Sequence, residues 1–171
     1  MSDSERLSLK IREVLEILRQ TAHPSRTFFT DEARKLLEWK DTHGISGLWD
    51  EPPLMLTATV DDGWGHGLEV IRLYAAAAGV RVHHLGLLCT PEFIIEECLK
   101  HEPDILGMTV LQFDTEDALA MIREKIPVKT QIVAGGPLFR ADPEFAHRCG
   151  IDVTAKDAAE FMSYLLACRK F

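Results

Sequence analysis

The sequence lacks the cysteine pattern of a disulfide-rich or zinc-binding protein. It contains no CxxC pair, and its four cysteines are scattered at Cys89, Cys98, Cys149 and Cys168. This distribution is typical of reduced thiols inside the cell. No apolar run is long enough to cross a bilayer, and the polar start MSDSERLSLK does not resemble a secretory signal. The sequence therefore predicts a cytoplasmic protein that does not enter a membrane.

Positive charge is also scarce. Lys and Arg total 19 residues against 27 Asp and Glu, which gives a formal net charge of −8. Nucleic acids and anionic membranes bind basic protein faces, so neither is expected as the main partner. The chain has 171 residues, of which 46% are hydrophobic. This is enough for one domain with a full core and a small appendage.

Residues 1–50 predict a helical extension, and residues 51–171 predict the α/β domain that follows it. A helix over residues 5–20 carries one apolar stripe, formed by Leu7, Ile11, Val14, Leu15 and Leu18. A second short helix over residues 31–41 is expected to begin with Thr30 as its N-cap. Two helices cannot form a stable unit alone. We expect them to pack on the α/β domain, on a partner protein or in a homodimer.

From residue 54 onward, strand patterns alternate with helix patterns. This alternation indicates right-handed βαβ units and a parallel sheet. Five strands suit the flavodoxin-like order 2-1-3-4-5, a Rossmann-like α/β fold. The expected strands are residues 54–60, 80–86, 104–111, 129–136 and 151–155. The expected helices are residues 67–79, 90–101, 114–126, 142–150 and 156–171, with Thr90 and Asp114 as two of the caps.

The ligand crevice of this fold lies at the carboxyl ends of strands 1 and 3. Four loops are expected to meet there: DDGWGHG (residues 61–67), TVLQFD (109–114), AGGPLF (134–139) and TAKD (154–157). The first loop contains two acids, a tryptophan, a histidine and three glycines. The sequence therefore predicts that the binding site, whatever its ligand, is centred on the DDGWGHG loop.

Residues 53–168 resemble the cobalamin-binding domain of corrinoid proteins, such as methionine synthase, B12-dependent mutases and the corrinoid carriers of methyltransferase systems. The family signature is Asp-x-His-x-x-Gly after strand 1, Ser-x-Leu or Thr-x-Leu after strand 3, and Gly-Gly after strand 4. Thr109–Leu111 matches the second motif and Gly135–Gly136 matches the third. The resemblance implies that the chain binds cobalamin, as a carrier or sensor that works with a partner methyltransferase or regulatory protein.

The first motif departs from the family pattern. Asp62 and Gly67 are in place, but Trp64 occupies the position of the histidine. In the family this histidine is the lower ligand of cobalt, and the aspartate binds its far nitrogen. An indole has an N–H donor and no lone pair for a metal. Trp64 therefore cannot replace the histidine as a ligand.

Three interpretations of the loop stay open. In the first, the corrinoid binds without a protein ligand (a His-off site), and Trp64 covers its lower face as an apolar plate. In the second, His66 is the cobalt ligand, kept neutral by the positive end of the helix that follows. In the third, the fold has lost the corrinoid and serves a partner protein or another planar cofactor such as haem.

The resemblance assigns cofactor contacts to three loops. They are Asp62, Gly63, Trp64, Gly65, His66, Gly67, Thr109, Val110, Leu111, Gly135, Gly136 and Pro137. Each has a plain structural alternative. Asp62 can be a loop acid or a helix cap, Thr109 an ordinary hydroxyl at a strand end, and the two glycines a turn. No catalytic residue is predicted, because no nucleophile–base pair or metal triad stands out.

The same fold also occurs in phospho-receiver domains. Asp61 and Asp62 resemble their acidic pair, and Lys156 falls after strand 5, where their lysine lies. Their phosphoacceptor aspartate should end strand 3, but that place is MTVL, and Asp114 comes too late. The sequence therefore favours a cobalamin-binding protein over a receiver, with a corrinoid-free adaptor or haem binder as the main alternative.

Overall fold

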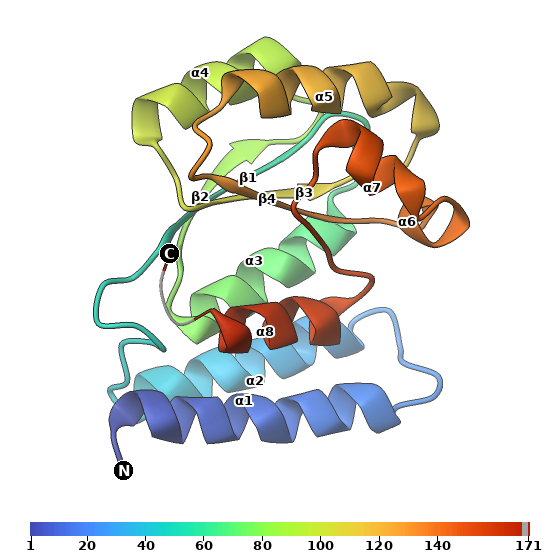
Figure 1. Ribbon diagram of the computed structural model, residues 1–171. Coiled ribbons are helices and arrows are strands. Elements are labelled where there is room, and N and C mark those ends of the chain that lie inside the picture. Colours follow the sequence, from blue (N-terminus) through green and yellow to red (C-terminus); the bar gives the residue numbers. More distant parts are fainter. Residues whose placement is uncertain (169–170) are drawn as a thin grey trace. The chain divides into compact units, whose positions relative to one another are not determined.

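The computed structural model describes residues 1–168 and residue 171, and it comprises two compact units (Figure 1). Unit 1 contains residues 1–53, 69–81 and 157–171. Unit 2 contains residues 54–68 and 82–156. Nearly all of the sheet and the loops that carry the predicted motifs belong to unit 2, whereas the N-terminal helices belong to unit 1. The domain boundary at residue 50 stays a prediction.

The sheet has five strands in the order β2-β1-β3-β4-β5, as predicted. The strands are β1 (Leu54–Thr59), β2 (Arg81–Gly86), β3 (Ile105–Thr109), β4 (Gln131–Gly135) and β5 (Val153–Thr154). β1, β3 and β4 pair in parallel, and their register aligns Thr59 with Thr109 and Thr109 with Gly135. The last residues of these three strands are therefore level, so the loops that follow them start at one edge of the sheet.

The helices of unit 2 cover one face of this sheet. They are α4 (Pro91–His101), α5 (Glu116–Lys125), α6 (Leu138–Ala141) and α7 (Glu144–Cys149), with a 3₁₀ turn at Phe113–Thr115. Figure 1 shows α4 and α5 side by side above the strands. Alternate strand residues such as Leu56, Leu106 and Ile132 pack against Ile94 of α4 and Ile122 of α5 in one buried cluster. This core gives the strand ends a rigid support.

Unit 1 is helical. It contains α1 (Asp3–Gln20), α2 (Phe28–Thr42), most of α3 (His66–Ala78) and α8 (Ala158–Ala167). The predicted stripe of α1 is buried, and α1 packs against both α2 and α8. Arg34 of α2 lies 3.3 Å from the Glu69 carboxylate of α3, and Lys40 donates to the Ala76 carbonyl. The N-terminal helices therefore find packing partners among helices of their own chain.

Several helix ends differ from the sequence predictions. Thr90 does cap α4 by accepting from the Phe93 N–H. Thr30 does not cap α2, because α2 begins at Phe28, two residues before Thr30. The Thr30 hydroxyl donates to the Thr27 carbonyl instead. Asp114 does not cap α5, because it lies within the 3₁₀ turn that precedes the helix. Both wrong predictions come from an extra turn that extends the helical segment toward its N-terminus.

The C-terminal region is shorter in regular structure than its sequence pattern suggested. β5 has two residues rather than the predicted five, and α6 was not predicted. α8 ends at Ala167, with Cys168 as its C-cap. The predicted continuation of this helix to residue 171 includes residues 169 and 170, which lie outside the described residues. None of the described helices is both long and apolar enough to span a bilayer.

Candidate cofactor site at the strand ends

The predicted site residues of three loops meet at one edge of the sheet in unit 2. Residues 61–67 follow β1, residues 110–112 follow β3 and residues 136–137 follow β4. Direct contacts join the loops: the Val110 N–H donates to the Gly135 carbonyl at 2.9 Å, and Thr109 bonds to Asp62. The structure thus brings together the motif residues that the sequence analysis selected.

Asp62 fixes the shape of the DDGWGHG loop. Its Oδ1 atom accepts hydrogen bonds from the Trp64 N–H at 2.8 Å and the Gly65 N–H at 3.0 Å. Its Oδ2 atom accepts from the Thr109 hydroxyl at 3.2 Å. Burial opposes ionisation, but these three hydrogen bonds and nearby His66 outweigh it and lower the pKa of Asp62 below its ordinary value. Asp62 is therefore an ionised, structural acid of the loop.

Thr59, the last residue of β1, ties this loop to the loop after β2. Its hydroxyl donates to the Asp62 carbonyl and accepts from the Leu88 N–H at 3.0 Å. The Thr59 carbonyl accepts from the Cys89 N–H at 2.7 Å. Leu88 itself has a positive φ of 52°, a conformation that L-residues with side chains adopt at some cost. The role of Thr59 could not be predicted, because a threonine within a β-strand pattern gives no signal that its hydroxyl joins two loops.

Asp61 joins the same loop to the one after β3. Its Oδ2 atom accepts from the Leu111 and Gln112 N–H groups, both at 2.8 Å. Its Oδ1 atom is buried, and no described residue donates a hydrogen bond to it. Both acids of DDGWGHG thus hold backbone N–H groups.

The Gly-Gly motif is required by close backbone packing. Gly136 has a φ of +146°, and a Cβ atom there would overlap the carbonyl oxygen of Val110. A Cβ atom on Gly135 would lie 2.8 Å from the carbonyl oxygen of Ala155. Pro137 follows as the N-cap of the short helix α6. The glycines are therefore explained by the fold itself, and their contact with a cofactor stays a prediction.

Trp64 is the most unusual side chain of the site, because 81% of it is exposed. Large apolar side chains that follow β2 and β3 are also exposed: Leu87, Leu88, Leu111 and Phe113. A Cβ atom on Gly65, which has a φ of +69°, would lie 2.8 Å from Leu87 Cδ2, so the loop backbone rests on that leucine. Exposed apolar groups gathered in adjacent loops are typical of a ligand or partner surface. Leu87, Leu88 and Phe113 were missed, although the LGLLC stretch after strand 2 offered a signal.

His66 is the first residue of α3 and is exposed. Its electrostatic interaction with Asp62 helps to lower the pKa of that carboxyl group. The expected start of the helix was Gly67, one residue later. The role of His66 as a cobalt ligand stays a prediction.

The arrangement does not match a phospho-receiver site. β3 ends with Met108 and Thr109, where a receiver needs an aspartate. Asp61 and Asp62 both accept hydrogen bonds from loop N–H groups.

The buried cysteines do not form a reactive site. Burial raises the pKa of Cys98 to about 12 and that of Cys149 to about 11, so neither is a ready nucleophile.

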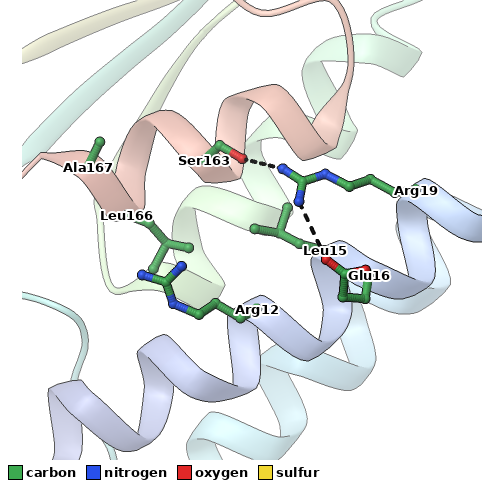
Figure 2. A pocket seen from close by; sticks show the side chains of 7 residues that line it. All are labelled: Arg12, Leu15, Glu16, Arg19, Ser163, Leu166 and Ala167. Carbon is green, nitrogen blue, oxygen red and sulfur yellow. Dashed lines mark hydrogen bonds and ion pairs between the residues drawn. The ribbon is translucent and has the colours of Figure 1, made fainter.

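Unit 1 has a surface groove of its own between α1 and α8 (Figure 2). The groove has a volume of about 520 Å³ and is lined by Arg12, Leu15, Glu16, Arg19, Ser163, Leu166 and Ala167. Arg19 spans it, donating to the Ser163 hydroxyl at 3.2 Å and lying 3.6 Å from the Glu16 carboxylate. None of the predicted site residues lines this groove, so the candidate site remains at the strand ends of unit 2.

Comparisons with known proteins identify a similar domain family and similar structures. Residues 54–163 match the family model described as the B12 binding domain. A novel cobalamin-binding protein from Desulfitobacterium hafniense DCB-2 has a similar structure, with a TM-score of 0.79 at 16% identity over 95% of this chain and 80% of that one. The monomethylamine corrinoid protein of Methanosarcina barkeri aligns with a TM-score of 0.62 at 22% identity, over 78% of this chain and 62% of that one. No curated protein matches the sequence. At these identities, the two structures show a shared fold.

Proposed function

Because the chain belongs to the family of B12-binding domains, we propose that the strand-end loops of unit 2 bind cobalamin without a nitrogen ligand from the protein. In this proposal the chain is a corrinoid carrier or sensor that presents the cofactor to a partner methyltransferase or regulator. The observation that carries the proposal is Trp64, an 81% exposed indole held at the position of the family's histidine by the bonds of Asp62.

The chemistry of the loops fits a large, partly apolar ligand. Trp64, Leu88 and Leu111 are apolar residues that follow the ends of adjacent strands. Their relative exposures are 81%, 60% and 39%. Leaving such side chains in water is unfavourable, and a corrin ring would cover them. Hydrogen bonds already join the three loops, so little ordering is needed when the ligand binds.

The hydrogen bonds of Asp62 support a site without a protein ligand. In the family pattern, the aspartate accepts from the metal-bound histidine. Here both Asp62 oxygens already accept, from two loop N–H groups and from Thr109. An indole has no lone pair for cobalt. The hydrogen bonds of Asp62 are therefore satisfied without a histidine partner.

The remaining motif residues would hold the rest of the cofactor. Thr109–Leu111 and Gly135–Pro137 lie on neighbouring strand ends, where the family places the nucleotide tail. When bound, cobalamin supplies a cobalt centre that can accept and release a methyl group. The chain would contribute binding, orientation and an apolar lower face. A partner protein would supply the methyl donor, or would respond to whether cobalamin is bound.

Desalting after mixing with hydroxocobalamin or methylcobalamin tests the proposal. We expect the protein to retain the coloured cofactor, and Trp64→Ala and Leu88→Ala to weaken binding by about five- to thirtyfold, since each removes about 1–2 kcal/mol of apolar contact. Leu99→Ala is the matched control, because Leu99 is a 55% exposed leucine on α4 outside the loops. Loss of both cofactors from the unmodified protein would overturn the proposal, and retention of haem in their place would favour the alternative of another planar ligand.

A further inference from the structure

A second cluster of metal-binding side chains lies outside the strand-end loops. His83 on β2 and Glu97 and His101 on α4 each offer a ligand atom, and these atoms all lie within 4.8 Å of one another. All three residues belong to unit 2. We propose that His83, Glu97 and His101 form a binding site for a divalent transition-metal ion such as Zn²⁺, independent of the cofactor site.

The distances are close to those that a metal requires. Ligands about 2.0–2.1 Å from a tetrahedral zinc ion lie roughly 3.3–3.5 Å from one another. His101 Nε2 is 3.2 Å from Glu97 Oε2, so this pair already has that spacing. The rings of His83 and His101 are 5.2 Å apart between centroids and inclined by 34°. A small side-chain rotation of His83 would close the triad.

The local structure explains why the three side chains converge. Glu97 and His101 are four residues apart on α4, a spacing that places them on the same helix face. Consecutive residues of a strand point to opposite faces of the sheet. His84 bonds to the Thr57 hydroxyl at 3.0 Å, whereas His83 lies beside His101. β2 is an edge strand, so the cluster connects one edge of the sheet to α4.

The two carboxylate oxygens of Glu97 have different partners. Lys100 Nζ binds Glu97 Oε1 at 3.1 Å, whereas the His101 ring lies at Oε2. The Glu97 side chain has a relative exposure of 12% and that of His101 31%, so ions can reach the cluster from solvent. Oε2 is thus the oxygen placed for the metal.

The donor set selects the class of ion. Two imidazoles and one carboxylate favour Zn²⁺, Co²⁺ or Ni²⁺ over Mg²⁺ and Ca²⁺, which prefer oxygen ligands. Three protein ligands leave at least one coordination position for water or for a side chain of another protein. Because the ligands come from β2 and α4, the ion would link the two elements and stabilise the folded state against unfolding.

Calorimetric titration of the cofactor-free protein with Zn²⁺, after removal of any affinity tag, tests the site. We expect one ion per chain and a rise in the unfolding temperature on adding Zn²⁺. His101→Ala and Glu97→Gln should weaken binding at least tenfold and abolish the temperature rise, whereas His23→Ala, which removes an exposed histidine of unit 1, should leave both unchanged.

Binding of Co²⁺ provides a second readout, because a tetrahedral Co²⁺ ion with nitrogen and oxygen ligands has strong visible absorption. His83→Ala should reduce that absorption without unfolding the chain, since His83 is exposed. The proposal is overturned if Zn²⁺ does not bind, or if the three cluster variants bind it as tightly as the unmodified protein. It is equally overturned if His23→Ala weakens binding as much as they do.

Discussion

The Thr109 hydroxyl donates a hydrogen bond to the Asp62 carboxylate at 3.2 Å, across 47 residues of sequence. This bond joins the end of β3 to the loop after β1. Both residues are nearly fully buried, with 7% and 5% exposure. The contact makes Asp62, the acid of the first motif, a part of the framework of the site.

Removing the Asp62 side chain should destabilise the protein. Asp62→Ala leaves the Trp64 and Gly65 N–H groups and the Thr109 hydroxyl without their acceptor. We expect a loss of about 1–3 kcal/mol in the free energy of unfolding, measured by urea denaturation. Asp62→Asn keeps one acceptor oxygen and should lose less. Equal stability of all three proteins would contradict the role of Asp62 in the loop.

Asp62 should also make the stability of the folded protein depend on pH. The pKa of Asp62 is lower in the folded protein than its ordinary value. Its ionised form therefore adds stability above the unfolded pKa of about 3.9, and this contribution is lost as the pH falls toward the folded pKa. Asp62→Asn should accordingly lose less stability than the unmodified protein between about pH 5 and pH 3. Identical acid limbs of the two stability curves would refute this assignment.

A side chain at Gly136 should disrupt the fold of unit 2. The Cβ atom of Gly136→Ala would overlap the Val110 carbonyl oxygen, and the φ of +146° is unfavourable for alanine. We expect a loss of more than about 3 kcal/mol, as in other severe backbone clashes. Gly44→Ala is the matched control, because Gly44 has a φ of +65° and no atom within 4 Å of the added Cβ. That variant should lose only about 1–2 kcal/mol. Similar losses in both variants would show that the contact with Val110 is unimportant.

Tyr74 of α3 has a buried hydroxyl group. Its hydroxyl oxygen is buried, and no described residue forms a hydrogen bond with it. Burial raises the pKa of Tyr74 above its ordinary value. Desolvation of an unpaired hydroxyl is unfavourable. Tyr74→Phe should therefore leave the free energy of unfolding unchanged or raise it by up to about 2 kcal/mol, which thermal unfolding would detect. Tyr164→Phe provides the comparison, since the Tyr164 hydroxyl bonds to Cys168. A clear loss of stability in Tyr74→Phe alone would contradict the assignment.

The cysteines should differ in reactivity. Burial raises the pKa of Cys98 to about 12 and that of Cys149 to about 11, and both thiols are buried. Cys89 and Cys168 are partly exposed, and burial raises the pKa of each less strongly. In the folded protein at neutral pH, a thiol reagent should modify Cys89 and Cys168 first, and Cys98 and Cys149 only after unfolding. Mass spectrometry of digested protein would identify the modified residues, and early modification of Cys98 would contradict the prediction.

The order of the strands and the loops of the site could be predicted from the sequence, because alternating apolar patterns and glycine-rich loops follow simple rules. Thr109 and Gly135 lie where their positions at the ends of predicted strands placed them. Helix starts were less predictable. Thr30 and Asp114 resemble N-caps, but in the structure the helical segment begins before each of them.

The contacts between loops could not be derived from the sequence. In the sequence Asp61 resembled one member of a receiver's acidic pair, whereas in the structure it accepts from the Leu111 and Gln112 N–H groups some 50 residues away. Such a bond depends on the three-dimensional meeting of two strand ends, for which the local pattern carries no information. The cluster of His83, Glu97 and His101 was hidden for the same reason, because it combines a strand residue with one turn of the following helix.

In the proposed complex, cobalamin binds above Trp64 without a nitrogen ligand from the protein. Electron paramagnetic resonance of the Co(II) form, with the protein labelled with ¹⁵N and the cofactor unlabelled, tests it most directly. We expect a spectrum without hyperfine splitting from a ¹⁵N nucleus. A ¹⁵N doublet would show that a protein nitrogen binds the cobalt and would refute the proposed site, and loss of the doublet in His66→Ala would identify His66 as the ligand.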